Sequence, residues 1–201
     1  MGNPAAPEGT FWTIGQLAER CGHYCWLEGR LFELTGSRAS APGGAAPAAS
    51  DPEIRLYLSV LSARHAFLAA QWRERLPVRS GVDAAAFVVP PPGPAGEVLD
   101  LCAAEPDLVL VLGGLVEQVL PALLDGYDRH LAHASVVREA PVRAVLELAG
   151  LVGRPEVEGG QALLRRVAGT PDQAGEVAAF GARLQRRLGD LTGVFPCARA
   201  S

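Results

Sequence analysis

Apolar residues recur at the spacing of an α-helix along several long stretches of this chain, and this pattern limits its fold more than any other feature. An apolar side chain every three to four positions forms a stripe on one face of a helix. In the first stretch the stripe consists of Leu17, Cys21, Tyr24, Cys25, Leu31 and Phe32. The whole pattern predicts helices over about 11–36, 51–76, 96–134 with a break near Pro106, 140–168 and 171–189. Such a chain buries its apolar surface by packing helices on helices.

The composition agrees with a purely helical fold. Apolar residues make up 49% of the chain, mostly as Ala, Leu and Val, whereas aromatic residues make up only 6%. Sequences that form sheets are richer in β-branched and aromatic residues. The segment DLVLVL at 107–112 has a strand as its alternative, but its apolar spacing continues in helical phase through Leu131, which favours a helix. We therefore predict an all-α fold.

The length of 201 residues suits one domain with a sizeable core. We assign residues 1–201 to a single helical domain whose core covers about 11–168. Two segments rich in Ala, Gly and Pro, at 37–50 and 76–94, are predicted to be flexible connections, and residues 190–201 are predicted to be a tail.

Local signals mark where several helices begin. A Ser or Thr followed three positions later by Glu or Gln is a capping box, in which the two side chains bond to backbone N–H groups of the first turn. The chain has such pairs at Thr13 with Gln16, Ser50 with Glu53, and Thr170 with Gln173. These pairs support the predicted starts of the first, second and last helices.

Two prolines fall inside predicted helices. Pro121 removes a backbone hydrogen bond, so we expect it to kink its helix. Beyond Pro155 the apolar stripe continues in the same phase through Leu163 and Leu164. This continuity favours one helix kinked at Pro155, with two separate helices as the alternative.

Charge and hydropathy argue against several classes of function. The net charge is −4 and the basic residues are scattered, so the sequence shows no cluster of positive charge of the kind that binds nucleic acid. The N-terminus lacks the pattern of a secretory signal. The apolar run LVLVLGGLVEQVL at 108–120 is expected to be too short and too interrupted to span a bilayer, and its Gly113–Gly114 pair is predicted to permit close helix packing. We expect a cytoplasmic protein without a membrane partner.

The four cysteines are interpreted as small buried hydrophobic residues. They are Cys21, Cys25, Cys102 and Cys197. Two positions four apart on a helix have poor geometry for a disulfide, and no second Cys or His pair stands at the spacing of zinc ligands.

One polar residue interrupts the apolar stripe near the middle of each of four long helices. These residues are Glu28, His65, Tyr127 and Glu156. In a bundle, residues at the middle of its helices share a layer, so we expect these side chains to meet. A carboxylate on a buried face must be paired, protonated or bound to a ligand. The layer could therefore be a structural polar core, a pocket or a metal site. His23, Glu33, Glu117 and His130 are expected at the surface or on the flanks of the stripes.

The layout resembles the ferritin-like superfamily, in particular a group of actinobacterial proteins of ferritin-like type. The resemblance covers about residues 13–168 and rests on the segments YCWLEGRLFELTG, ARHAFLAAQWRERLP, LPALLDGYDRHLAHA, APVRAVLELAG and PEVEGGQALL. It implies an up-down four-helix bundle with a short fifth C-terminal helix. It also implies a homodimer.

The ligand pattern departs from that of the di-iron members of this superfamily, which use Glu on two helices and Glu-x-x-His on the other two. Here Ser62 occupies the Glu position of the motif that would end at His65. Neither Glu147 nor Glu156 has a His three positions later. The resemblance then leaves two alternatives. The bundle has no metal, or it holds a single iron or manganese ion on Glu28, His65 and Glu156, since two carboxylates and one imidazole suit these metals.

Two functions remain open. The first is an enzyme, or a descendant of one, acting on a small organic molecule in specialised metabolism. In it Glu28 and Glu156 would be acid–base groups or ligands, His65 a base or ligand, and Tyr127 a hydrogen-bond donor. The second is a non-catalytic helical binding module in which an ion pair of Glu28 with His65 is a structural part of the core.

Overall fold

The computed structural model describes residues 12–40, 52–78, 81 and 83–189. Within these ranges the ordered elements are helices and no strand occurs, which confirms the all-α prediction. Residues 107–112, for which a strand was the alternative, lie at the start of a helix. Residues 37–40 of the connection predicted at 37–50 are helical, so its predicted start was wrong. The rest of that connection at 41–50, the tail at 190–201, Ser50 and Cys197 lie outside the described residues.

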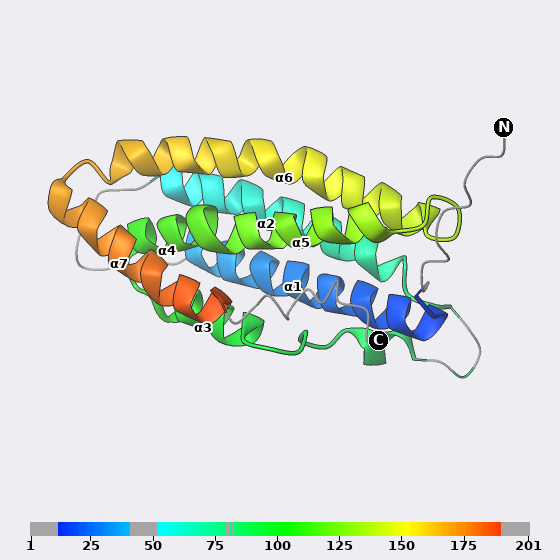
Figure 1. The fold of residues 1–201 in the computed structure, drawn as a ribbon. Helices are drawn as coiled ribbons and strands as arrows, with labels where there is room; N and C mark the ends of the chain where they lie inside the picture. Colours follow the sequence, from blue (N-terminus) through cyan, green and yellow to red (C-terminus); the bar gives the residue numbers. More distant parts are fainter. Residues whose placement is uncertain (1–11, 41–51, 79–80, 82, 190–201) are drawn as a thin grey trace, which may run out of the picture.

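Four long helical segments lie side by side (Figure 1). They are α1 (Ile14–Ser40), α2 (Pro52–Arg73), a run made of α4 (Leu108–Gly114), the π-helical turn η2 (Leu115–Val119) and α5 (Leu120–His133), and α6 (Ala140–Val167). α1 therefore continues four residues beyond its predicted end.

The long segments do not simply alternate in direction along the chain. Figure 1 shows α1 and α6 running one way, whereas α2 and the α4–α5 run go the other way. The contacts agree. Tyr57 of α2 bonds to the backbone of Glu156, and Arg64 bonds to that of Val152, so α2 and α6 are antiparallel. A single long connection carries the chain from the end of α2 back to the end of the bundle where α2 begins, and α4 starts there (Figure 1). In an up-down arrangement, by contrast, each long helix is antiparallel to the next one in the sequence.

The connection from α2 to α4 carries structure of its own. It contains the 3₁₀ turn η1 (Ala84–Phe87) and α3 (Ala95–Ala104), which contacts α1 and α7. The predicted break near Pro106 is therefore a complete separation of α3 from α4. The turn η1 lies directly on α1, because a Cβ atom at Gly22 would come within 1.9 Å of the Phe87 carbonyl oxygen.

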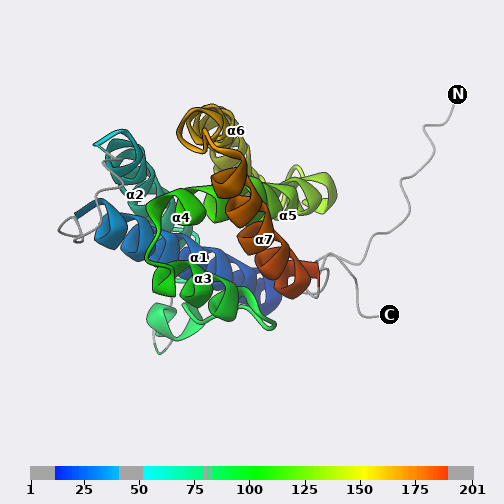
Figure 2. The ribbon, with the colours of Figure 1, turned by 90° about the vertical axis from the view of Figure 1, so that its left-hand side faces the viewer.

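The last helix, α7 (Pro171–Leu188), crosses α4 (Figure 2). A Cβ atom at Gly113 would lie 2.6 Å from the Val177 side chain, and one at Gly114 would lie 2.7 Å from Phe180 and Leu184. The glycine pair thus permits close packing of α4 and α7, as predicted.

Helix ends and prolines follow local rules. The capping box at the start of α1 is formed, because the Thr13 N–H donates to Gln16 and the Gln16 N–H donates back to the Thr13 hydroxyl. Thr170 caps α7 by accepting from the Gln173 N–H. α6 is one helix with Pro155 inside it, so the single-helix interpretation is confirmed.

The π-helical turn η2 ends two residues before Pro121. The Leu120 N–H bonds to the Leu115 carbonyl, five residues back. The next such bond would need an N–H on Pro121, which proline lacks. The Val116 carbonyl instead accepts from the Gln161 side chain of α6 at 3.2 Å. The expected effect of Pro121 therefore takes the form of a π turn tied to a neighbouring helix.

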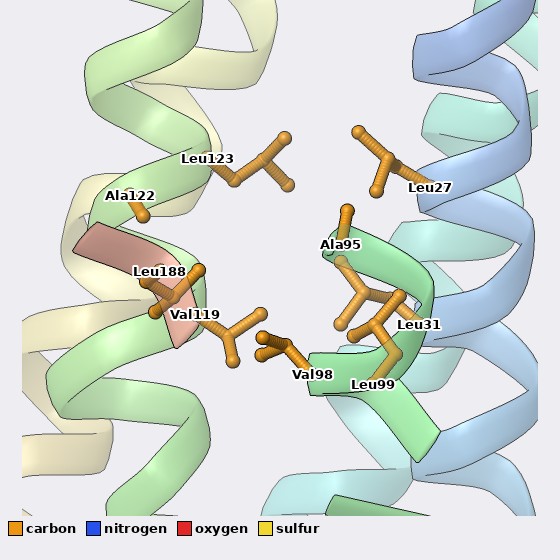
Figure 3. A pocket seen from close by; sticks show the side chains of 9 residues that line it. All are labelled: Leu27, Leu31, Ala95, Val98, Leu99, Val119, Ala122, Leu123 and Leu188. Carbon is orange, nitrogen blue, oxygen red and sulfur yellow. The ribbon is translucent and has the colours of Figure 1, made fainter. Parts of the chain in front are cut away.

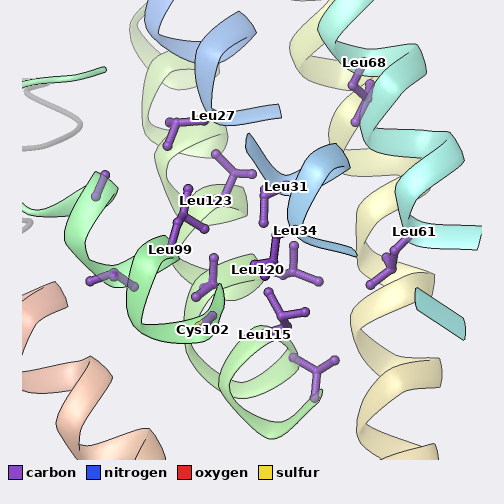
Figure 4. Packing of buried hydrophobic residues seen from close by; sticks show 14 of the residues in the cluster. Leu27, Leu31, Leu34, Leu61, Leu68, Leu99, Cys102, Leu115, Leu120 and Leu123 are labelled. Atoms are coloured by element: carbon purple, nitrogen blue, oxygen red, sulfur yellow. The ribbon is translucent and has the colours of Figure 1, made fainter. Parts of the chain in front are cut away.

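One apolar core fills the space between the helices (Figure 4). The apolar stripe predicted for the second helix is buried, and it consists of Ile54, Leu58, Leu61, Leu68, Trp72 and Leu76. Phe32 of α1 is 44% exposed, so its inward placement was wrong. The three described cysteines, Cys21, Cys25 and Cys102, are free and buried. Their place in the apolar core confirms their interpretation as core residues. Burial raises the pKa of the Cys21 and Cys102 thiols to about 12, which disfavours the reactive thiolate.

The run Leu108–His133 is long and apolar enough to cross a membrane, and 56% of its most apolar 18-residue stretch is buried within the protein. The expectation that this region is too short for a membrane span was therefore wrong on length, since the helix continues through Pro121. Core helices of globular proteins pass the same test, so the finding is weak evidence for a membrane location.

Candidate functional site

The four polar residues predicted to share a layer line one small cavity between α1, α2, α5 and α6. Its volume is about 20 Å³, and the remaining lining residues are Leu68, Leu120, Leu123, Leu124, Ala149 and Gly153. Each helix contributes one polar side chain: Glu28 from α1, His65 from α2, Tyr127 from α5 and Glu156 from α6. A space of this size holds about one water-sized group.

Glu28 is the centre of the site. It is completely buried, and both of its carboxylate oxygens are engaged by other helices. The Tyr127 hydroxyl donates to Oε1 at 2.5 Å, and His65 Nδ1 lies 2.5 Å from Oε2. We call Glu28, His65 and Tyr127 the Glu28 cluster. Hydrogen bonds to an ionised group are short and strong, so this cluster ties α1 to both α2 and α5.

The carboxylate determines how the imidazole of His65 is oriented. A carboxylate only accepts hydrogen bonds, so Nδ1 carries the proton that lies between His65 and Glu28. In a neutral ring Nε2 then presents a lone pair. Nε2 is buried and has no hydrogen-bond partner among the described residues. His65 therefore lines the cavity with one nitrogen held and the other available to a ligand.

Tyr127 acts as a hydrogen-bond donor at neutral pH. Burial, followed by the negative charge of Glu28, raises the pKa of its phenol well above the ordinary value. Its ring packs edge-on against Tyr24 at a centroid distance of 4.9 Å and lies 5.7 Å from Trp72. These rings close the site on the side facing the α5–α6 turn.

Glu156 forms the outer edge of the site, and its side chain is 9% exposed. Its Oε1 is 2.9 Å from Arg64 Nε, close enough for an ion pair but outside good hydrogen-bond alignment. Burial raises the pKa of the Glu156 carboxyl, and the charges of Arg64 and His65 oppose that rise. Arg64 is 43% exposed, so Glu156 connects the cavity to a group that reaches solvent.

The donor set does not fit the three-ligand metal site. Both oxygens of Glu28 are taken by protein donors, and Glu156 is held by a guanidinium. Within the described ranges no group of three or more His, Cys, Asp or Glu residues has the arrangement of a metal site. This leaves His65 Nε2 and one side of Glu156, and two donors fall short of the usual ligand count.

The sequence analysis missed a second buried polar group near the α5–α6 turn, which we call the His130 cluster: Tyr24, His130 and Glu139. The Tyr24 hydroxyl is 3.1 Å from His130 Nδ1, and His130 Nε2 is 3.6 Å from Glu139 Oε2. His130 is 1% exposed, so its predicted place on a flank was wrong. Burial, then the charges of Arg20 and His133, lowers the pKa of His130 to about 3.

One signal in the sequence could have indicated the His130 cluster. His130 stands three positions after Tyr127, and such pairs are neighbours on a helix surface. Glu139 had no such signal, because it lies in the turn before α6 and reaches His130 only through the path of that turn.

Comparison of the chain with profiles of known protein families, with curated proteins and with solved structures finds no significant match.

Proposed function

We propose that the protein is an acid–base enzyme, or the descendant of one, that acts on a small organic molecule at the cavity between the four long helices. The observation that carries this proposal is the buried and unpartnered Nε2 of His65 beside a cavity, with Nδ1 held by Glu28. A carboxylate that fixes the tautomer of a histidine leaves the other nitrogen as a general base or acid.

Each residue has a role in this proposal. His65 exchanges a proton with the ligand, and Glu28 orients His65 and stabilises its charged form. Tyr127 holds Glu28 in place from the opposite side. Glu156, with a raised pKa and a link to Arg64 at the edge, is the second acid–base group and the path to solvent. Separate environments for two carboxylates are a recurrent basis for acid–base pairs.

We further propose a ferritin-like origin for the bundle. Its support is the topology, with two antiparallel pairs joined by one long connection, which is how ferritin-like folds differ from simple up-down bundles. On this proposal the ancestral chain lost metal-binding side chains from the middle layer of the bundle, and the remaining polar side chains formed the Glu28 cluster.

A structural core is the second candidate function, and one observation favours it. The two oxygens of Glu28 are fully engaged within the protein, and the cavity beside them holds only about one water-sized group. On this alternative the Glu28 cluster sets the register of α1, α2 and α5 in a binding module.

Metabolite profiling separates the two candidates. Wild-type protein is incubated with a small-molecule extract of its producing cells, and mass spectrometry records compounds that are consumed or formed. We expect a change that is lost in His65→Gln and strongly reduced in Glu28→Gln. His133→Gln, at an exposed histidine of α5, is the matched control and should behave as wild type. A change that persists in a folded His65→Gln protein would overturn the acid–base proposal.

A further inference from the structure

A second cavity lies against the outer side of α1 and α5, and its lining is entirely apolar. Its volume is about 30 Å³ (Figure 3). The lining residues are Leu27, Leu31, Ala95, Val98, Leu99, Val119, Ala122, Leu123 and Leu188. They come from α1, α3, η2, α5 and the end of α7, so the long connection and the last helix build this cavity together.

The apolar cavity and the polar cavity share one wall. Leu123 lines both of them. On α1, Leu27 and Leu31 of the apolar cavity flank Glu28 of the polar cavity in the sequence. Figure 3 shows Leu123 and Leu27 extending toward each other from α5 and α1. Movement of the Leu123 side chain to another rotamer would therefore join the two spaces.

The two cavities differ in what they can bind. The polar cavity offers hydrogen-bond acceptors, because His65 Nε2 lacks a partner and Glu156 is a carboxyl group. A hydrogen-bond donor such as a hydroxyl or amino group suits these acceptors. A carboxylate is disfavoured, since Glu28 and Glu156 already line the space. The apolar cavity offers only hydrocarbon contacts, which suit a short alkyl chain.

We propose that the joined cavities bind a short-chain primary amine or alcohol, with its alkyl chain in the apolar cavity and its polar group beside His65 and Glu156, and that Leu123 is the gate between them. This inference rests on the proposed acid–base function and names the class of its substrate. The two spaces measure about 30 and 20 Å³, so the ligand is a short molecule with a few non-hydrogen atoms.

Among the lining residues, those nearest to solvent lie at the end of α7 and on the adjoining turn of α5. Ala122 and Leu188 are half-buried, whereas the other seven lining residues are buried. A ligand therefore meets the apolar cavity first and the polar cluster last. This order selects for molecules that carry both an alkyl chain and a donor group.

Methyl and imidazole NMR of the full-length protein tests the proposal, with n-butylamine, n-butanol, butyrate and methylamine as probes. We expect n-butylamine or n-butanol to shift the methyl signals of Val98, Val119 and Leu123 together with the ring nitrogens of His65. Butyrate should bind about tenfold more weakly or not at all. The variant Ala95→Leu, which fills the apolar cavity, should weaken n-butylamine binding by at least about tenfold, and Ala103→Leu on the exposed side of α3 is its matched control.

Three outcomes would overturn the proposal. Shifts confined to the Val98 and Val119 methyls, with His65 unchanged, would mean that the cavities are not joined. A His65 response to methylamine without any methyl response to n-butylamine would refute the chain-binding site and leave the acid–base proposal standing. Equal binding by wild type and Ala95→Leu would place the probe elsewhere. Should Ala95→Leu fail to fold, NOE contacts between n-butylamine and Val98 or Val119 of the wild type decide the same question.

Discussion

The Glu28 cluster and the His130 cluster contain the same three residue types, a tyrosine, a histidine and a glutamate, yet they do different things. In the Glu28 cluster the carboxylate lies at the centre and holds both partners at 2.5 Å. In the His130 cluster the histidine lies at the centre, and its carboxylate partner is 3.6 Å away. The first cluster joins three helices around a cavity, whereas the second joins α1 to the end of α5 and to the turn that follows it.

The second cluster is built into the α5–α6 connection. The Ser135 N–H donates to the Glu139 carboxylate, and the Glu139 N–H donates back to the Ser135 carbonyl. Arg143 donates to the carbonyl of Leu131 in the last turn of α5 and to that of Ala134, which follows α5. Within the described part of the chain, His130 Nε2 and Glu139 Oε2 also lack hydrogen-bond partners, as His65 Nε2 does. The comparison therefore teaches that the clusters differ in their surroundings, since the first lines a cavity and the second is tied into a turn.

The largest difference between the clusters should appear on removing the carboxylates. Glu28→Ala leaves the Tyr127 hydroxyl and His65 Nδ1 without a partner in the core, so we expect a loss of about 3–5 kcal/mol in the free energy of unfolding. Glu139→Ala should cost about 1–3 kcal/mol. Urea unfolding measures both, with Glu33→Ala at an exposed glutamate as the control. Equal costs would remove the distinction between the clusters.

The pH dependence of stability should reveal the His130 cluster. The pKa of His130 is about 3 in the folded protein, below its ordinary value of 6.5, so the unfolded chain takes up a proton that the folded protein does not. The free energy of unfolding should therefore fall as the pH drops below about 6.5, by roughly 1 kcal/mol per pH unit from this residue.

His130→Gln provides the comparison for that pH profile. Chemical unfolding of wild type and variant at several pH values between neutral and acidic should give a flatter profile for the variant. Identical slopes would show that His130 takes up its proton equally in both states and would contradict its assignment as a buried neutral group.

Removal of the two tyrosine hydroxyls should have smaller effects. Tyr127→Phe removes a bond to a charged group and should cost about 1.5–3 kcal/mol, whereas Tyr24→Phe removes a bond to a neutral imidazole and should cost about 0.5–1.5 kcal/mol. Thermal and urea unfolding of the two variants sharpen the comparison. A larger cost for Tyr24→Phe would make the His130 cluster the stronger one.

The smallest effects are expected at the arginines near each cluster. Arg143→Ala removes bonds to two turn carbonyls and should cost about 1 kcal/mol. Arg64 is 43% exposed, so loss of its ion pair with Glu156 should cost about 0–1 kcal/mol. Under the proposed function Arg64→Ala should change the product profile more than the stability, and Arg143→Ala should do the reverse. Both are read from the unfolding and metabolite measurements described above.

Most of the helical elements were predictable, because helix formation depends on local spacing and end signals. The stripe of α2, the capping box at Thr13 and the single helix through Pro155 all follow from nearby residues. Phe32 and His130 were misplaced because the orientation of a helix face is averaged over its length. The π turn at Leu115–Val119 shifts that face between α4 and α5, and nothing in the spacing alone reports such a shift.

The sequence by itself determined most of the helices and the inward positions of Glu28, His65 and Tyr127, because both depend on a period of 3.6 residues and on the cost of burying a charge. Only the tertiary structure decided that Glu28 lies between His65 and Tyr127 and that Nε2 of His65 is left without a partner. It also decided that Leu123 separates a polar space from an apolar one. These features depend on distances between residues far apart in the chain, which are set by how the helices cross and pack rather than by any local spacing.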